Sequence, residues 1–295
     1  MAFASMVLVI ASPPNQAPTF NSMPELLHIG FDNTHRFKKK SYLFQYKGID
    51  YKLIQNNPRR WSDVLITIVP FNNETIKEKT FTNAGEFLSA LSWVNHSPVS
   101  VQYLGGMGVP NGFNLRDAKC RVFDFPQTPF HGRILGSDLS IISAIKTEDQ
   151  RKALVLFREA FSSNRRLFSF LLYWQILEIG GNKPVEWINK LLAHPLGYDL
   201  PISDIRQLAI GSKSLGEYLL DDCRHAIAHI KRFTGKTSLS FDQVSENLRL
   251  AISTNIVEQF ARIHIVSNLN LKGHMYLFPQ GRGRIPIFHE RFAKP

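Results

Sequence analysis

EYLLDDCRHAIAHIKRF, residues 217–233, is the stretch that sets the character of the C-terminal half of this chain. Its apolar residues recur at spacings of three and four, which is the pattern of a helix that faces a core. They are Leu219, Cys223, Ala226, Ile227 and Ile230. The stretch therefore predicts a core-facing helix from Glu217 to Phe233.

Ionisable side chains lie beside that apolar stripe. At ~100° per residue, one neighbouring face carries four of them, and two more lie next to it. The four are Asp222, His225, His229 and Arg232, and the two are Asp221 and Arg224. Histidine and arginine gain nothing from burial unless they are paired. This composition favours a functional site, and the alternative interpretation is a salt-bridged surface helix.

These residue types suit the cleavage of RNA by transesterification, which needs a base for the 2′-hydroxyl and a cation for the charge on phosphorus. Histidine, with an unperturbed pKa of ~6.5, accepts a proton near neutrality. Arginine stays charged and binds two phosphate oxygens at once. We assign His229 as general base or acid, Arg224 to the phosphate, and His225 to orientation or the second proton transfer. Asp221 and Asp222 are expected to hold Arg224 or to set a histidine tautomer.

The hexapeptide Arg224-His225-Ala226-Ile227-Ala228-His229 resembles the signature of the HEPN superfamily, an arginine and a histidine five residues apart on a helix of an all-α domain. The surrounding run is most similar to the Apea-like branch, which includes small prokaryotic proteins labelled methylamine utilization protein MauJ. The resemblance covers roughly the last half of the chain. It implies a metal-independent endoribonuclease, often of a defence or toxin system, whose site forms where two such helices meet in a homodimer.

A dimer also follows from helix geometry, because Arg224 and His229 diverge by ~140° on one helix and a two-fold axis would bring in a second set. A regulatory partner protein is a further possibility. In some HEPN proteins a tyrosine two residues after the histidine is modified by a partner nucleotidyltransferase. Lys231 occupies that position here, which argues against this form of control.

Two other functions compete with the nuclease. His225 and His229, with Asp221 or Asp222, have a spacing that allows them to share a metal ion. Against this, Ala226 stands where a zinc protease carries its glutamate, and Arg224 would repel a cation. We therefore predict neither metal nor cofactor. The second alternative is a non-catalytic HEPN-fold module that binds RNA or a partner protein.

The chain of 295 residues carries a formal net charge of +11, spread over both halves, which suits a polyanionic partner such as RNA. Basic residues near the motif and in the tail are expected to contact nucleic acid; they are Lys231, Arg232, Arg282 and Arg284. Two cysteines, Cys120 and Cys223, form no disulfide framework. No run of ~20 apolar residues occurs, so we expect a soluble, cytoplasmic protein without a membrane span.

The sequence predicts the α+β class, with a mixed α/β domain over residues 1–140 followed by an all-α HEPN-like bundle over residues 141–295. The first domain has no function that the sequence reveals beyond a possible sensor or partner-binding role. Its expected elements are a strand at residues 6–11, a hairpin turning at Lys47-Gly48, a third strand within residues 62–71, a helix starting near Thr82 and a tight turn at residues 105–108.

The second domain is predicted to contain five or six helices. Thr147 and Gln150 form a capping-box pattern, and the apolar run from Arg165 to Ile179 predicts a helix buried on several sides. Glu178, near the end of that run, is expected to contact Arg224. The basic tail completes this domain.

Overall fold

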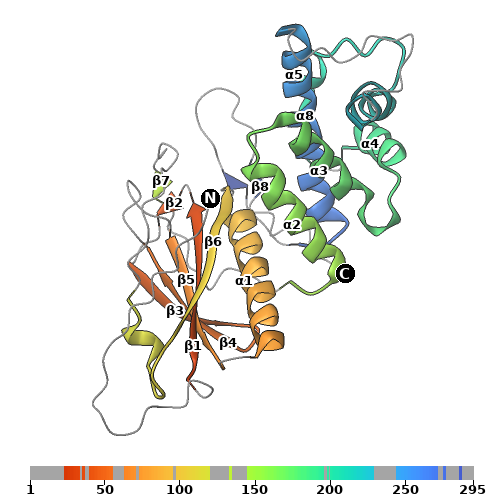
Figure 1. The fold of residues 1–295 in the computed structure, drawn as a ribbon. Helices are drawn as coiled ribbons and strands as arrows, with labels where there is room; N and C mark the ends of the chain where they lie inside the picture. The colour runs from red at the N-terminus through yellow and green to blue at the C-terminus, as the bar shows by residue number, and fades with distance from the viewer. Residues whose placement is uncertain are drawn as a thin grey trace, which may run out of the picture.

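A computed structural model describes residues 23–33, 35–36, 40–55, 63–70, 73–95, 98–119, 133–134, 145–195, 198, 200–228, 244–271, 275–276 and 286–287. The N-terminal part is a sheet with one long helix, and the C-terminal part is helical, so the predicted α+β class is confirmed (Figure 1). The strand expected at residues 6–11 lies outside the described residues, as does Cys120. Within the ranges above, no helix combines the length and the apolar character needed to cross a bilayer.

Five antiparallel strands form the main sheet, in the order β3-β4-β5-β1-β6. Their bounds are β1 Glu25–Asn33, β3 Ser41–Tyr46, β4 Ile49–Ile54, β5 Asp63–Val69 and β6 Val99–Gly108. Lys47 and Gly48 join β3 to β4 with positive φ angles of 48° and 77°, as a tight hairpin turn requires. The predicted hairpin and third strand are confirmed. The short pairs β2 (His35–Arg36) with β7 (Arg133–Ile134) and β8 (Met275–Tyr276) with β9 (Pro286–Ile287) lie outside this sheet.

The tight turn predicted at residues 105–108 was wrong, because these residues are the last part of β6 and pair with β1. Gly106 explains why glycine occurs in a strand here. A Cβ atom on it would lie 2.0 Å from Oε1 of Glu25 and 3.2 Å from the side chain of Leu27. Gly106 therefore makes room for side chains of the neighbouring strand.

The helix start predicted near Thr82 was also wrong, because α1 runs from Glu74 to Asn95. Residues 74–79 are polar except for Ile76, so they carry no apolar period that would reveal the start of the helix. Contacts with residues outside the helix hold them instead. The Asn73 carboxamide accepts from the backbone of Ile76 at 3.0 Å, and Lys77 pairs with Glu25 of β1 at 2.7 Å.

Each face of the sheet has its own apolar core. Helix α1 covers one face, where Phe31, Tyr51, Leu53 and Phe87 are fully buried. On the other face, Val64 and Ile66 pack beneath the short helix η2 (Leu115–Asp117).

The C-terminal part consists of packed helices. They are α2 Glu148–Ser162, α3 Arg166–Glu178, η4 Ile179–Gly181, α4 Pro184–Ala193, α5 Ile202–Ile205, α6 Leu215–Tyr218, a π-helical segment η5 Leu219–His225, α7 Ala226–Ala228 and α8 Val244–Ser267. The capping box of Thr147 and Gln150 begins α2 as predicted. Helix α3 is buried between α2 and α8, which confirms the prediction from its apolar run.

Helix α1 joins the sheet to the helices, and Figure 1 shows it between the sheet and α2. Trp93 of α1 meets Phe157 of α2 edge to face at 5.0 Å between ring centroids. The Glu86 carboxylate, 3% exposed, pairs with Lys47 of the hairpin turn and with Arg151 of α2. The two parts therefore share a packed, charge-paired contact. The predicted domain boundary at residue 140 falls in a stretch that the structure does not describe.

Candidate functional site

The motif stretch is helical from Leu215 to Ala228, but its central seven residues, Leu219–His225, form a π-helix. The sequence predicted one regular helix from Glu217, so both the start and the regularity were wrong. A π-helix has i→i+5 hydrogen bonds and a wider turn than an α-helix. The faces calculated at ~100° per residue therefore shift through this segment. Such segments are frequent at functional sites.

Two local contacts fix the start of this helix. Ser214 and Glu217 form a capping box: the Ser214 hydroxyl accepts from the backbone N–H of Glu217 at 3.3 Å, and the Glu217 carboxylate accepts from the backbone N–H of Ser214 at 2.9 Å. Asn189 of α4 accepts from the backbone N–H of Gly216 at 3.2 Å and donates to Ser214 at 3.0 Å. Gly216 lies so close to α4 that a Cβ atom would be 2.8 Å from the backbone oxygen of Val185. Helix α4 therefore positions the N-terminal end of the motif helix.

The apolar side of the motif helix faces the core as predicted, with Leu219, Cys223 and Ile227 buried. The Cys223 thiol lies 3.5 Å from the Ser253 hydroxyl of α8. Burial raises the pKa of this thiol, which keeps it protonated near neutrality. Cys223 therefore packs in the hydrophobic core beneath the motif helix and takes no chemical part in the site.

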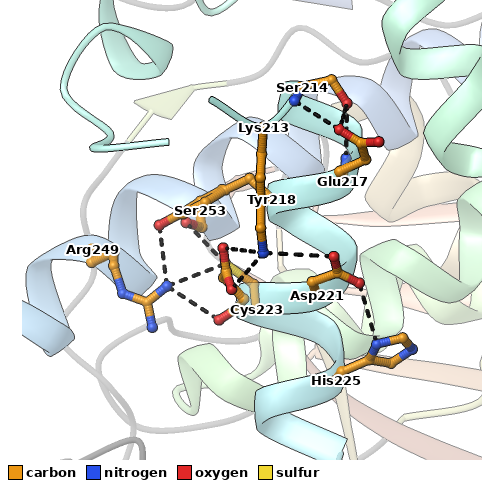
Figure 2. Close-up of polar contacts among 10 residues, drawn as sticks. Lys213, Ser214, Glu217, Tyr218, Asp221, Cys223, His225, Arg249 and Ser253 are labelled. Atoms are coloured by element: carbon orange, nitrogen blue, oxygen red, sulfur yellow. Dashed lines mark hydrogen bonds and ion pairs between the residues drawn. The ribbon is translucent and has the colours of Figure 1, made fainter. Parts of the chain in front are cut away.

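Arg249 of α8 contacts the π-helical segment from the side (Figure 2). Its guanidinium donates to the Tyr218 hydroxyl at 3.1 Å and to the backbone oxygen of Asp222 at 3.2 Å. Glu246 holds the same guanidinium at 2.7 Å. The Asp222 carbonyl, inside the irregular turn, thus receives a donor from another helix, which stabilises the π-helical geometry.

Lys213 lies between the two carboxylates of the motif. Its ammonium donates to both Asp222 oxygens at 3.0 and 2.9 Å and lies 3.6 Å from Asp221 (Figure 2). The hydrogen bond that Lys213 donates to the Asp222 carboxylate raises the pKa of Lys213, so the lysine stays charged. Instead of Arg224, as one expectation had it, these carboxylates hold Lys213, which lies outside the motif helix.

Asp221 also contacts a histidine, as the second expectation for these carboxylates proposed. Its Oδ1 lies 3.7 Å from Nδ1 of His225, four residues later. This distance suits an ion pair when the imidazole is protonated and a loose orienting contact when it is neutral. The His225 side chain is 36% exposed, so solvent reaches it.

Arg224 faces α3, and the expected contact with Glu178 is present. Nη2 of Arg224 lies 4.0 Å from Oε1 of Glu178. The same oxygen accepts the indole N–H of Trp174 at 2.8 Å, and the buried tryptophan thereby fixes the carboxylate. Both members of the pair are partly exposed, Arg224 at 33% and Glu178 at 42%. The guanidinium is thus held in place by a long ion pair and remains open to solvent.

The other predicted site residues lie outside the described residues. These are His229, Lys231, Arg232, Arg282 and Arg284. The structure therefore places one histidine of the motif and not the second. Among the described residues, no group of three His, Cys, Asp or Glu side chains is arranged to hold a metal ion. The rival metal site needs His229 and is not tested by that observation.

Sequence reasoning missed Lys213 and Arg249, which hold the site together. Neither belongs to the motif helix. Lys213 precedes the helix in a turn, and Arg249 lies on α8, beyond residues 229–243. A periodic pattern within one helix gives no signal for either residue.

Comparison with known proteins addresses this helical part. Residues 153–266 match a family model described as "Methylamine utilization protein MauJ", whereas no curated protein and no solved structure matches the chain. The matched residues run from α2 into the last turn of α8 and include every described site residue from Glu178 to Arg249. The helical part that carries the candidate site is therefore similar to the MauJ family, as the motif resemblance predicted.

Proposed function

We propose that this protein is a metal-independent endoribonuclease of the HEPN type, which acts in a prokaryotic defence or toxin system. One observation supports it most: Arg224, partly exposed and loosely paired with Glu178, lies on the same helical run as His225 and its partner Asp221. A cation open to solvent beside histidine is what phosphodiester cleavage needs. The proposal depends on these residues and not on the name of the matching family.

Arg224 is assigned to the scissile phosphate. An exposed ion pair at 4.0 Å is worth only ~0–1 kcal/mol, so a phosphate displaces Glu178 at small cost. Phosphate oxygens then bind the guanidinium fork at two points. In the absence of RNA, Glu178 and Trp174 keep the arginine in position. The ion pair with Glu178 thus orients Arg224 toward the position in which it would bind the substrate phosphate.

The histidines carry the proton transfers in this mechanism. His229 removes the proton from the 2′-hydroxyl, whose oxygen attacks the adjacent phosphorus and forms a 2′,3′-cyclic phosphate. The bond to the 5′-oxygen breaks, and that oxygen receives a proton from a protonated histidine, for which His225 is the candidate. Asp221, whose Oδ1 lies 3.7 Å from Nδ1 of His225, orients the His225 ring. Arg224 offsets the charge on the phosphate oxygens during the attack.

The active unit in this proposal is a homodimer joined through the helical parts. One motif helix offers few groups to surround a phosphate, and a two-fold axis beside it adds a second Arg224–His229 set. Mixing Arg224→Ala and His229→Ala protomers tests this arrangement, because a composite site regains activity in the heterodimer. A monomer that cleaves RNA at the wild-type rate would exclude it.

The central test is cleavage of total RNA by the purified protein in the presence of EDTA, with analysis of the product ends. We expect 2′,3′-cyclic phosphates and a loss of most activity for both Arg224→Ala and His229→Ala, the loss of acid–base help in the latter alone being ~10²–10⁴-fold. Arg116→Ala on η2 and His194→Ala after α4 are matched controls, because both side chains are exposed and lie outside the described site. An absolute requirement for added Mg²⁺ or Zn²⁺ would refute the proposal.

Glu178→Gln tests whether Glu178 competes with RNA phosphate for Arg224. Glutamine keeps an acceptor for the Trp174 indole but removes the charge that competes with phosphate. We expect tighter RNA binding, measured with an RNA that has no free 2′-hydroxyl and is therefore not cleaved. Weaker binding would show that Glu178 supports the RNA-bound geometry of Arg224 rather than competing with RNA.

A further inference from the structure

Helix α3 is buried on most sides, but one face of it remains open to solvent. Phe168 is 50% exposed, Leu171 is half-buried, and Gln175 and Glu178 are exposed. The spacings of three, four and three place these four residues on one face of the helix. We call these residues the α3 strip.

The α3 strip connects two charged ends. Glu178 at its C-terminal end contacts Arg224 of the candidate site. Arg165 and Arg166 are exposed at its N-terminal end, within one turn of Phe168. In the part of the chain that the structure describes, neither guanidinium forms an ion pair or a side-chain hydrogen bond. At 1.5 Å per residue, Phe168 and Glu178 are about 15 Å apart along the helix axis.

An exposed aromatic ring within one turn of two arginines, neither of which is ion-paired among the described residues, matches the chemistry of single-stranded nucleic acid. Bases stack on exposed aromatic side chains, while arginines bind the phosphates between them. The formal net charge of +11 adds a general attraction for a polyanion. The distance from Phe168 to the site suits a few nucleotides of an extended strand.

We propose that the α3 strip from Phe168 to Gln175, together with Arg165 and Arg166, binds the single-stranded RNA that leads into the Arg224 site. This inference rests on the proposed function, because it names where the nucleotides that flank the scissile phosphate bind. Phe168 stacks on one base, and the two arginines bind phosphates at the far end of the strip. The residues act on substrate affinity and take no part in bond cleavage.

Fluorescence anisotropy with 2′-O-methyl RNA, which lacks the attacking hydroxyl, measures this binding on the full chain in EDTA. We expect Phe168→Ala to weaken binding about fivefold or more, because stacking on an aromatic side chain contributes at least that factor per base. Phe168→Tyr retains a ring and should bind like the wild type. Phe168→Leu retains apolar area without a ring and should bind as weakly as Phe168→Ala.

The dependence of affinity on salt isolates the arginines. Loss of two phosphate contacts reduces the slope of log affinity against log salt by about 1.4 for a single strand. We expect this reduction for the double variant Arg165→Gln/Arg166→Gln. The matched control is Arg116→Gln/Lys119→Gln, which removes the same charge from exposed residues beside the sheet and should leave the slope unchanged. An equal reduction in the control would overturn the inference, since only the overall charge would then matter.

Cleavage assays separate this inference from the proposed function. In a nuclease with this surface, the Phe168 and arginine variants raise KM for a long RNA and leave the cleavage of a dinucleotide unchanged. A wild-type protein that cleaves RNA, with strip variants that bind and cleave like it, would refute the surface and leave the proposed function standing. Stacking and salt effects as described, without any cleavage, would support the surface and refute the nuclease.

Discussion

Replacing Gly216 with alanine tests the close approach of the motif helix to α4. A Cβ atom at this position would lie 2.8 Å from the backbone oxygen of Val185, 2.9 Å from its Cα and 3.1 Å from Oδ1 of Asn189. Two of these atoms belong to the backbone and have no rotamer that clears the space. The helices must therefore separate, or the contact must distort.

The magnitude follows from two opposing effects. Overpacking of a well-packed contact costs about 1–3 kcal/mol. Alanine regains about 1 kcal/mol over glycine from helix propensity. We therefore expect Gly216→Ala to lower the free energy of unfolding by about 0–2 kcal/mol. Because only Glu217 and Tyr218 separate Gly216 from the π-helical segment, RNA cleavage by this variant should also fall.

Gly85→Ala in α1 is the matched control, because an added Cβ atom there has no neighbour within 4 Å. It should raise the free energy of unfolding by about 0.5–1 kcal/mol through propensity alone. Urea unfolding of both variants measures the difference, with the m-value checked for constancy. If Gly216→Ala stabilises the protein as much as Gly85→Ala does, the helices are not in contact at this position and the reasoning fails.

Three further outcomes follow from the described contacts. Lys213→Met removes the cation that holds both motif carboxylates, so they become free to compete for the catalytic arginine, and RNA affinity should fall several-fold relative to the exposed control Lys190→Met. Arg249→Met leaves a backbone carbonyl of the π-helical segment without its donor and should cost about 1–3 kcal/mol in urea unfolding, with a loss of activity at temperatures where the fold persists. Burial lowers the pKa of His264, so its stabilising contribution is complete above the unfolded value of ~6.5 and is lost as the pH falls below it. Between pH 7.5 and 5, the free energy of unfolding should therefore fall less for His264→Gln than for the wild type.

Elements with a local signal were predictable from the sequence. The hairpin turn needs two residues with positive φ, and Lys47 and Gly48 supply them between two strand-forming segments. The α2 start depends on side chains three residues apart, Thr147 and Gln150, which cap each other wherever the rest of the chain lies. The apolar run of α3 has to be buried whatever its neighbours are. In each case the determining contacts lie within a few residues.

The errors came from elements whose determinants lie elsewhere in the chain. The first turns of α1 are polar and are held by Glu25 of β1, so their own sequence resembles a loop. Residues 105–108 are part of strand β6 because β1 pairs with them, and Gly106 leaves the space that side chains of β1 occupy. A local pattern cannot report a neighbour that folding brings from more than 50 positions away.

The candidate site shows the same division. The sequence alone determined which chemical groups are present: an arginine and histidines on one helical run, carboxylates next to them, and an apolar stripe that anchors the run to a core. Only the tertiary structure decided how they are used. It inserts a π-helical turn supported by Arg249, pairs Lys213 with the motif carboxylates, and brings Glu178 to Arg224. The physical reason is that residue types and helical period are encoded locally, whereas charge pairing and helix distortion depend on packing between helices distant in sequence.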